Sequence, residues 1–538
     1  MSMPGSIVPI APQQMRFTAL QRRFFRCVLA CSLLTVLGSL AAHAQTFIPP
    51  VSSPTGFWNS TFVVHNDHTL GMDYPSQAYL GIRLSGTSWN TIETARGTYD
   101  WTPIDNYTNN GGNLLYTFQN TPAWANSSGV KNLPPTNLQD YYDFVTALMV
   151  HICPTSSTCK IKNFEAWNEF SSNGYWDTNY STLATMSAHA AKIVKQYCTN
   201  CQFGAGSVSA GGLGWNDVET NSRNSSHPHW TYYDEALTVF LDAWKADVAA
   251  DSTLPEPDFI SWHAYPARGF VDSTHPITPQ PMPEYSYSGN GLGAGDYTGS
   301  TYCTTANQSR TTNQNCVDSI LVQATTIGAL TSTSAHGVLG KPIWVTEGGF
   351  NPLYSMANPD NHNSNPELPC HSGGVPCTQD VIRAAFLARW LIMLHAHSVA
   401  RAYWYAWDDA CYGTLFGSTS DGSDPVCTFN FASEKVAYHV KTPAGIAWDQ
   451  AQLWMNGATA PASCAENGTT HIYSCTITRT NPAGYVGLMV WYTPWLQTTN
   501  YTPPAGYTQY RTLDGTVTAY SGGSIVLGAE PVIFEKKT

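Results

Sequence analysis

Strand-like and helix-like segments alternate along most of this chain, and this alternation limits its fold more than any other feature. Short apolar, β-branched or aromatic runs are expected to form strands at residues 62–65, 79–84, 113–118, 161–167, 202–208, 258–265, 342–346 and 401–407. Helical patterns follow at residues 138–152, 183–197, 232–249, 317–331, 379–397 and 445–456, while the first two connections are less clearly helical. Eight such units predict an α/β fold of the (β/α)8 TIM-barrel type, with functional residues at the carboxyl ends of the strands.

A doubly wound parallel sheet is the structural alternative to a barrel. Such a sheet normally has a glycine-rich phosphate turn after its first strand, but here Val-His-Asn-Asp occupies residues 64–67. The glycine-rich stretch at residues 204–209 lacks a third glycine in register, and no serine in it is flanked by glycines two residues away on both sides. The sequence therefore favours the barrel and argues against a dinucleotide site or a nucleophilic serine elbow.

The pattern changes after Gly457, where only strand-like segments remain. They lie at residues 471–478, 486–492, 507–513 and 525–534 and are separated by Pro, Gly and Asn. We therefore expect a catalytic barrel at residues 45–457 and a small C-terminal β-rich, sandwich-like accessory domain at residues 458–538. Packing against the barrel is the commoner role for such a domain, and glycan binding is the alternative.

The first residues have the composition of an export signal. Four arginines within residues 16–26 precede an apolar run at residues 27–42, and Ala42-His43-Ala44 provides the small residues of a cleavage site. We therefore expect a signal peptide at residues 1–44, a secreted or periplasmic mature protein and no membrane association after cleavage. An apolar run of this length is short for a membrane anchor. The pair Arg22-Arg23 followed by Phe25 also partly resembles a twin-arginine signal, so the export route stays open.

Cysteine spacing agrees with export. Of 14 cysteines, two lie in the signal, and the others form the close pairs 153/159, 198/201, 303/316, 370/377, 411/427 and 464/475. Local disulfides in an oxidising compartment are the expected outcome. The segment Cys198-Thr199-Asn200-Cys201 also resembles a redox or zinc motif, but no second such pair and no histidine at ligand spacing accompany it. We expect neither a metal ion nor a cofactor.

The charge balance limits the partners. The formal net charge of −12 argues against nucleic acid, whose phosphates require a basic surface. Only 12% of residues are charged while 12% are aromatic, so the polarity comes from Ser, Thr, Asn and Gly. A neutral polar surface rich in aromatic rings fits a carbohydrate partner, although secreted proteins of other kinds share this composition. The sequence does not indicate an oligomeric state.

Acidic residues follow two of the predicted strands. Glu169 ends the segment Trp167-Asn168-Glu169 after the fourth strand, and Glu347 lies in Thr346-Glu347-Gly348 after the seventh. The fourth and seventh strands lie across the mouth of an eight-stranded barrel, so these side chains can converge. Retaining glycosidases need two carboxyl groups about 5–5.5 Å apart. One acid after a strand is often only a helix cap, but the pair together with Asn168 is more specific.

Further motifs accompany these two acids. They are Gly-Ile-Arg-Leu at residues 81–84, Trp89 with Gly-Thr-Tyr-Asp-Trp at 97–101, Thr-Pro-Ala-Trp at 121–124, and Trp-His-Ala-Tyr at 262–265. With them the chain resembles the clan A retaining glycoside hydrolases, and most closely family 39 and its relatives. The resemblance spans roughly residues 62–457. Phe170 replaces the family's usual proline, and Gly348-Gly349 replaces bulkier residues, which weakens any transfer of substrate specificity.

The resemblance implies a role for each matching residue. Glu169 would be the acid/base and Glu347 the nucleophile. The expected substrate-binding residues are His65, Arg83, Trp124, Asn168, His263, Tyr265, Trp404 and Trp407. Among them, Asn168 would hold the sugar 2-hydroxyl, and Arg83, His263 and Tyr265 would surround the nucleophile. The structural alternatives are an Arg83 ion pair with a barrel carboxylate, a core imidazole at His263, and core packing by the three tryptophans.

The residue chemistry supports these roles. Arg83 and Tyr265 are suited to keeping Glu347 ionised, while Trp167 and the charge of Glu347 would keep Glu169 protonated. The expected function is that of a secreted retaining enzyme that cleaves β-glycosidic bonds in poly- or oligosaccharides by double displacement, exo-acting and xylosidase-like. An endo-acting glucanase or mannanase of the same clan and a non-catalytic glycan-binding barrel are the alternatives.

Overall fold

The structure is a computed structural model. It describes residues 55–58, 81–110, 112–155, 158–172, 174–209, 233–264, 320–349, 379–405, 415, 441–455, 458, 464–479, 484–493 and 498–536. The predicted signal peptide at 1–44 and the predicted first strand at 62–65 lie outside these ranges, as do His65, Tyr265, Trp407 and the cysteine pairs 303/316, 370/377 and 411/427.

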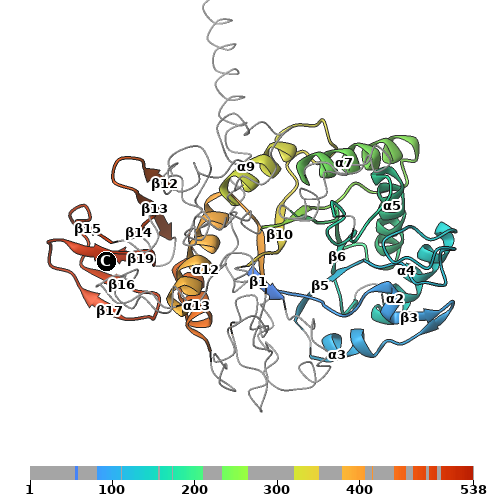
Figure 1. The fold of residues 1–538 in the computed structure, drawn as a ribbon, viewed down its shortest axis with the longest axis horizontal. Helices are drawn as coiled ribbons and strands as arrows, with labels where there is room; N and C mark the ends of the chain where they lie inside the picture. Colours follow the sequence, from blue (N-terminus) through green and yellow to red (C-terminus); the bar gives the residue numbers. More distant parts are fainter. Residues whose placement is uncertain are drawn as a thin grey trace, which may run out of the picture. The chain divides into compact units, whose positions relative to one another are not determined.

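A nine-stranded sheet carries the centre of the fold, and all its strand pairings are parallel (Figure 1). Its order is β7-β6-β5-β2-β1-β11-β10-β9-β8. The strands are β1 (Thr55–Trp58), β2 (Gly81–Arg83), β5 (Asn113–Thr117), β6 (Asn163–Glu165), β7 (Gln202–Gly204), β8 (Val208–Ser209), β9 (Ile260–His263), β10 (Ile343–Glu347) and β11 (Arg401–Tyr405).

This sheet curls back on itself. The end strands β7 and β8 are separated only by residues 205–207, and Gly204 at the end of β7 bridges Phe259 just before β9. On one face, Thr346 of β10 donates a hydrogen bond of 2.5 Å to Glu165 of β6, although four strands separate β6 from β10 in the sheet order. A flat sheet with strands about 4.8 Å apart would hold these two strands roughly 24 Å apart. Side chains from distant strands therefore meet on the concave face.

Helices connect the parallel strands, as in repeated βα units. They are α4 (Leu138–Ile152), α5 (Tyr180–Tyr197), α7 (Tyr233–Ala250), α9 (Ile320–Thr331) and α12 (Gln379–Ala396), while α13 (Pro443–Met455) follows the last parallel strand. The connection from β2 to β5 instead contains α2 (Trp89–Ile92), the hairpin β3 (Glu93–Ala95) and β4 (Thr98–Tyr99), and α3 (Thr102–Asn110). Asn137 and Asn179 cap α4 and α5, because their side chains accept hydrogen bonds from the first-turn amides of Gln139 and Thr182.

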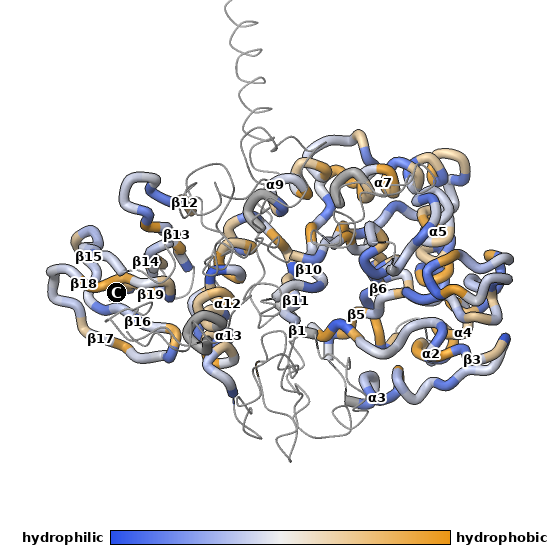
Figure 2. The backbone as a smooth tube through the Cα atoms, viewed as in Figure 1, coloured by the Kyte–Doolittle hydropathy of each residue, from blue (hydrophilic) through white to orange (hydrophobic). Residues whose placement is uncertain are grey.

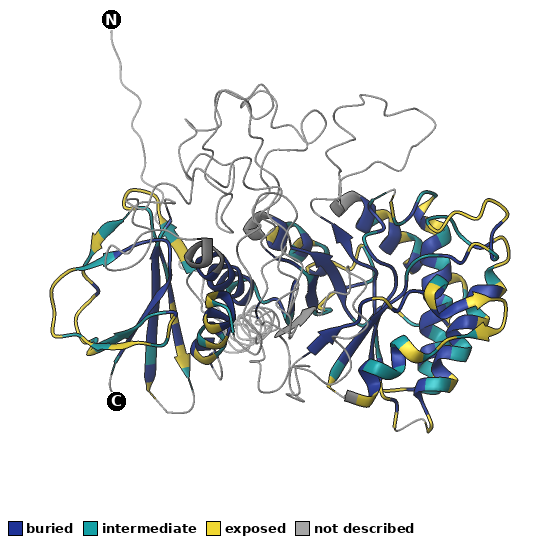
Figure 3. Cartoon of the chain, turned by 60° about the horizontal axis from the view of Figure 1, so that its bottom comes forward, coloured by how far each residue is buried: buried dark blue, intermediate teal, exposed yellow. Residues whose placement is uncertain are grey.

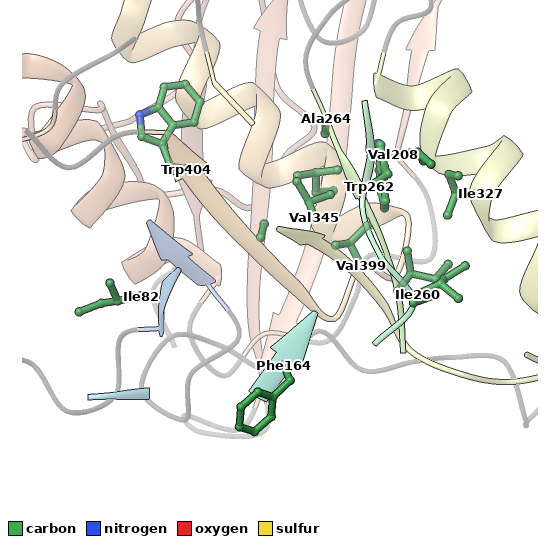
Figure 4. Packing of buried hydrophobic residues seen from close by; sticks show 14 of the residues in the cluster. Ile82, Phe164, Val208, Ile260, Trp262, Ala264, Ile327, Val345, Val399 and Trp404 are labelled. Carbon is green, nitrogen blue, oxygen red and sulfur yellow. The ribbon is translucent and has the colours of Figure 1, made fainter. Parts of the chain in front are cut away.

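Strand alternation divides the core between the two faces of the sheet. Ile82, Phe164, Ile260 and Val345 belong to one large buried cluster that also includes helix residues (Figure 4). A smaller buried cluster on the other face contains Leu115, Phe259, Trp344 and Tyr403. The strands of this sheet and the inner sides of its helices are largely buried, while exposed positions gather on turns and outer helix faces (Figure 3), and apolar and polar residues alternate along the helices (Figure 2).

The structure corrects the predicted position of the first strand. The strand between β11 and β2 is Thr55–Trp58, upstream of the predicted residues 62–65. The predicted segment 62–65 itself lies outside the described residues. The other seven predicted strands and the six predicted helices are confirmed, with the fifth strand divided into β7 and β8.

The C-terminal region folds as antiparallel sheets. Six strands form one sheet in the order β12-β13-β14-β19-β16-β17, and β15 pairs with β18. These strands are β12 (Cys464–Asn467), β13 (Ile472–Arg479), β14 (Tyr485–Tyr492), β15 (Thr499–Tyr501), β16 (Gln509–Arg511), β17 (Val517–Ala519), β18 (Ile525–Leu527) and β19 (Val532–Glu535). The single strand predicted at 525–534 is therefore wrong. It divides into two strands because Pro531, which has no backbone N–H, lies between them.

Buried contacts join α12 to the C-terminal region. The guanidinium of Arg389 on α12 is fully buried and donates hydrogen bonds of 2.7 Å to the carbonyls of Ala529 and Tyr492. Three predicted disulfides are present, Cys153–Cys159, Cys198–Cys201 and Cys464–Cys475, the last joining β12 to β13. Of the helices in the described ranges, none has the length and apolarity required to cross a bilayer.

Candidate active site

Charged side chains gather where four parallel strands end. Arg83 is the last residue of β2, His263 the last of β9, and Glu347 the last of β10. Asn168 and Glu169 follow the end of β6. Because the carboxyl ends of parallel strands meet at one edge of the sheet, these residues converge although the sequence separates them widely.

Arg83 connects the two acidic motifs. Its guanidinium donates to Glu347 Oε2 from Nη1 at 3.0 Å and to Asn168 Oδ1 from Nη2 at 2.7 Å. The side chain is fully buried. An arginine remains charged at any working pH, so Glu347 has a fixed cationic partner. The structure thus brings Arg83, Asn168 and Glu347 together.

His263 lies between the two candidate carboxylates. Its Nδ1 is 2.8 Å from Glu169 Oε1 and 3.4 Å from Glu347 Oε2. One ligand atom from each of Glu169, His263 and Glu347 lies within 4.8 Å of the others. The imidazole is fully buried, whereas the Glu169 and Glu347 side chains are 16% and 12% exposed. The carboxylates are therefore the groups through which this cluster reaches solvent.

Glu169 has an unusual backbone conformation. Its φ is +41°, a region that L residues other than glycine rarely adopt. The Ser207 segment between β7 and β8 holds the turn, since Ser207 Oγ accepts from the Glu169 amide at 3.3 Å and the Ser207 carbonyl accepts from Phe170 at 3.2 Å. A strained residue held by its surroundings is common at functional sites.

The electrostatics at Glu169 differ from the sequence expectation. Burial acts to raise the pKa of Glu169, but the hydrogen bond and positive charge of His263, a hydrogen bond from Ser209 and the charge of Arg83 outweigh burial and lower the pKa. The expected protonated acid against an apolar wall is therefore corrected. Trp167 is buried, packs against Trp176 and donates to the Tyr175 carbonyl.

Gly348 is required by the space around it. A Cβ there would lie 2.6 Å from Trp390 Cζ2 and 2.7 Å from the Ala264 carbonyl oxygen, both closer than real Cβ contacts. The departure from the family pattern at this position therefore has a packing reason. The Gly348 carbonyl also accepts a hydrogen bond from the Tyr405 amide at 2.7 Å, which holds the backbone directly after Glu347 against β11.

We expect Gly348→Ala to lower the free energy of unfolding by about 2–3 kcal/mol, because the added methyl group must displace a buried ring or a backbone carbonyl. Thermal and urea unfolding would measure the loss. Gly468→Ala is the matched control, since a Cβ at Gly468 meets nothing within 4 Å. Equal stability of the two variants would contradict this packing account.

Two tryptophans that were predicted to contact the substrate, Trp404 and Trp124, differ in their surroundings. Trp404 is fully buried and packs edge-on against Trp390 at 5.4 Å and against Phe386 at 6.1 Å, both on α12. Its ring faces the helix layer (Figure 4), so the structure replaces the predicted sugar contact with core packing. Trp124 is partly buried, donates to the Glu93 carbonyl at 3.0 Å and lies under the guanidinium of Arg96.

The sequence interpretation missed one member of the site. Glu165, the last residue of β6, is fully buried and bonded to Arg83 Nη2 at 2.8 Å. Burial acts to raise its pKa, but the charges of Arg83 and His263 and hydrogen bonds from Thr346 and Ser261 lower it overall. A carboxylate within an apolar strand was the signal that could have found it, because such groups are almost never fully buried without partners.

Two groups of side chains bring together three atoms of the kinds that bind metal ions. Glu169, His263 and Glu347 offer three ligand atoms, and so do Cys159, Cys198 and Cys201. The cysteines are in disulfides, which removes the thiolates that a metal needs. At the acidic cluster, Arg83 already supplies a positive charge to Glu347.

Solved structures with a similar fold are known, although the sequence itself has no recognised relative among the families and curated proteins compared. No protein-family model matches the chain, and no curated protein matches its sequence. A family 39 glycoside hydrolase from Bacteroides cellulosilyticus matches with a TM-score of 0.54 at 16% identity, over 91% of this chain and 81% of that one. A monomeric β-xylosidase from Caulobacter crescentus gives 0.46 at 13% identity over 91% and 97%. A family 44 endoglucanase from Clostridium thermocellum gives 0.49 at 11% identity over 92% and 98%. The first of these matches confirms the predicted resemblance to family 39 at the level of the fold.

Proposed function

We propose that this chain is a retaining glycoside hydrolase that cleaves β-glycosidic bonds in poly- or oligosaccharides. The observation that carries the proposal is the pair of accessible carboxylates, with an oxygen of Glu169 within 4.8 Å of an oxygen of Glu347. Retaining enzymes hold their carboxyl groups about 5–5.5 Å apart, whereas inverting enzymes need about 6.5–9.5 Å to admit a water molecule. The shared fold of the Bacteroides family 39 glycoside hydrolase also supports it.

In the proposed reaction, Glu347 attacks the anomeric carbon while Glu169 protonates the leaving oxygen. Arg83 keeps the Glu347 carboxylate ionised and oriented through its 3.0 Å contact. Glu169 must carry a proton for this first step, and His263 Nδ1 lies 2.8 Å from its Oε1. Glu169 then removes a proton from the water that releases the sugar from Glu347, so two inversions give net retention. Asn168, which Arg83 holds at 2.7 Å and which directly precedes Glu169, is the proposed contact of the sugar 2-hydroxyl.

The proposal extends to the architecture and location of the protein. The curled parallel sheet and its connecting helices support a closed (β/α)8 barrel at residues 45–457, followed by an accessory domain at 458–538. The three disulfides support folding in an oxidising compartment, consistent with a cleaved signal at residues 1–44 and a secreted or periplasmic enzyme. Trp124, His65, Tyr265 and Trp407 remain proposed contacts of the substrate.

A panel of glycans and aryl glycosides tests the function, with products separated by size. Release of single sugars from chain ends supports the exo-acting, xylosidase-like form of the proposal. Release of oligosaccharides of several sizes would instead identify an endo-acting glucanase or mannanase. Binding of a glycan without release of sugar from any substrate would identify a non-catalytic barrel.

The pH dependence tests the role of His263. Removal of its side chain in His263→Ala removes the hydrogen bond and the charge that lower the pKa of Glu169, so burial dominates and that pKa rises. Because Glu169 must be protonated for the first step, the alkaline limb of kcat/KM should move to higher pH, while kcat falls.

The control for this variant is His151→Ala. His151 also lies 2.8 Å from a carboxylate, Asp105, but on α4 and outside the cluster. Its pH profile should match that of the unmodified protein. An alkaline limb that stays in place or moves to lower pH in His263→Ala would contradict the role given to His263.

A further inference from the structure

Glu165 is a buried carboxylate at the end of β6 that accepts five hydrogen bonds. Its Oε2 accepts from Arg83 Nη2 at 2.8 Å, Arg83 Nε at 3.1 Å and Thr117 Oγ1 at 2.9 Å. Its Oε1 accepts from Ser261 Oγ at 2.7 Å and Thr346 Oγ1 at 2.5 Å. These donors come from β2, β5, β9 and β10, and the side chain is fully buried. Both oxygens are occupied and without solvent access, so Glu165 cannot itself reach a substrate.

One guanidinium links Glu165 to the residues that do reach solvent. Nη2 of Arg83 donates both to Glu165 and to Asn168, while Nη1 donates to Glu347. Arg83 Nε donates at 2.9 Å to Thr117, whose hydroxyl in turn donates to Glu165. On the side away from the accessible carboxylates, Arg83 is therefore held by Glu165 and by Thr117. Because a guanidinium is planar and rigid, hydrogen bonds at Nε and Nη2 also fix the direction in which Nη1 points.

Because Glu165 is buried, its negative charge acts on the nearby carboxylates Glu169 and Glu347 with little screening by solvent. Arg83 and Glu165 together form a neutral pair beside Glu169 and Glu347, which share His263. With Glu165 neutral, one positive charge would remain without its buried counter-charge next to both carboxylates. Interactions between such charges are weakly screened inside a protein.

We propose that Glu165 is a positioning residue for the glycosidase reaction, which orients Arg83 toward Glu347 and Asn168 and balances its charge. This inference rests on the proposed function. It gives Glu165 a role that a carboxylate serving only to join strands would not have, namely control of the pH range of activity.

The first test is Glu165→Gln, which keeps the shape and changes the charge. The hydroxyls of Ser261 and Thr346 can turn to accept from the new amide, while the remaining oxygen still accepts from Arg83. Loss of one negative charge lowers the pKa of both Glu347 and Glu169. Both limbs of the kcat/KM profile should therefore move to lower pH by about one unit, with about a tenfold loss on the alkaline side.

Glu535→Gln is the matched control for this charge change. Glu535 is also a buried carboxylate, bonded to Tyr485 Oη and Gln509 Nε2 at 2.8 Å and to Arg511 at 3.3 Å, but it lies in the C-terminal sheet. This variant should lose stability without any shift of the pH profile. A Glu165→Gln enzyme with both limbs unmoved would overturn the proposal.

The second test leaves the charge of Glu165 unchanged, so it remains informative even if the Glu165→Gln variant does not fold. Thr117→Val removes only the hydroxyl between Arg83 Nε and Glu165, so Arg83 loses part of its support and kcat should fall about tenfold. Thr117→Ser restores the hydroxyl and should restore kcat. Loss of kcat in both variants, or in neither, would overturn the proposed orienting role.

A crystal structure of Glu165→Asp separates this inference from the proposed function. Shortening the side chain by one methylene should draw Arg83 with it and open the 3.0 Å contact between Arg83 Nη1 and Glu347 Oε2 beyond hydrogen-bond distance. An unmoved Arg83 would refute the orienting role, whatever the protein cleaves. An unmodified protein that releases no sugar from any glycan would refute the proposed function but leave this structural result intact.

Discussion

Glu347→Ala is expected to abolish turnover, with a fall in kcat of more than about 10⁴-fold, because no covalent glycosyl-enzyme can form without the carboxylate. A fluoroglycoside with a good leaving group should label Glu347 alone in the unmodified protein, and peptide mass mapping would locate the label. Glu256→Ala is a suitable control, since Glu256 is an exposed carboxylate that pairs with Lys341. A label on any other carboxylate would overturn the assignment.

The configuration of the first product tests the same step independently. Two successive inversions at the anomeric carbon release the sugar with the anomeric configuration of the substrate. NMR during the first minutes of hydrolysis, before mutarotation, would identify the anomer. The opposite anomer as the first product would exclude a retaining mechanism.

Glu169→Ala should have an effect that depends on the leaving group. General acid catalysis contributes about 10²–10⁴-fold, so substrates with poor leaving groups should lose activity on that scale. Activated aryl glycosides need little protonation and should still form the glycosyl-enzyme. Azide should then replace the water that Glu169 no longer activates and give a glycosyl azide of retained configuration.

A uniform loss on all leaving groups would contradict the acid/base role of Glu169. The control is Asn163, the first residue of β6, which is buried and donates to Asn113 Oδ1 at 2.7 Å and to the Leu114 carbonyl at 3.0 Å. Asn163→Ala should reduce stability without leaving-group dependence and without rescue by azide.

The sequence was sufficient to predict most of the frame of this site. Seven of the eight predicted strands are present because each is a short apolar run bounded by polar turns, and tertiary pairing agrees with that local preference. The parallel arrangement then places Glu169 and Glu347 at one edge from their positions in the chain alone. The strand that pairs with β2 and β11, Thr55–Trp58, contains a glycine and only one β-branched residue, so its local pattern was too weak to predict it.

The details of the site depend on contacts that no local pattern contains. Glu165 acquires its role only because β2, β5, β9 and β10 bring their donors to it. The lowered pKa of Glu169 follows from His263, which lies 94 residues away in the chain. Strand alternation could have placed Trp404, since it shares a face with Ala402, whereas Tyr403 lies in the cluster on the concave face.

The buried guanidinium of Arg389 bears on how the chain unfolds, because it links α12 to the C-terminal sheet. Its acceptors are carbonyls at Ala529 and Tyr492, and its charge lies 5.8 Å from the ring centroid of Trp491. Removal of the C-terminal sheet would take these acceptors from α12 and would also expose its apolar side chains, which share one buried cluster with Trp491 and Ile533. The two regions should therefore melt in a single cooperative transition by calorimetry, and a chain cut after residue 457 should fail to fold. The accessory sheet is then an integral part of the enzyme's folding unit, inseparable from the catalytic framework.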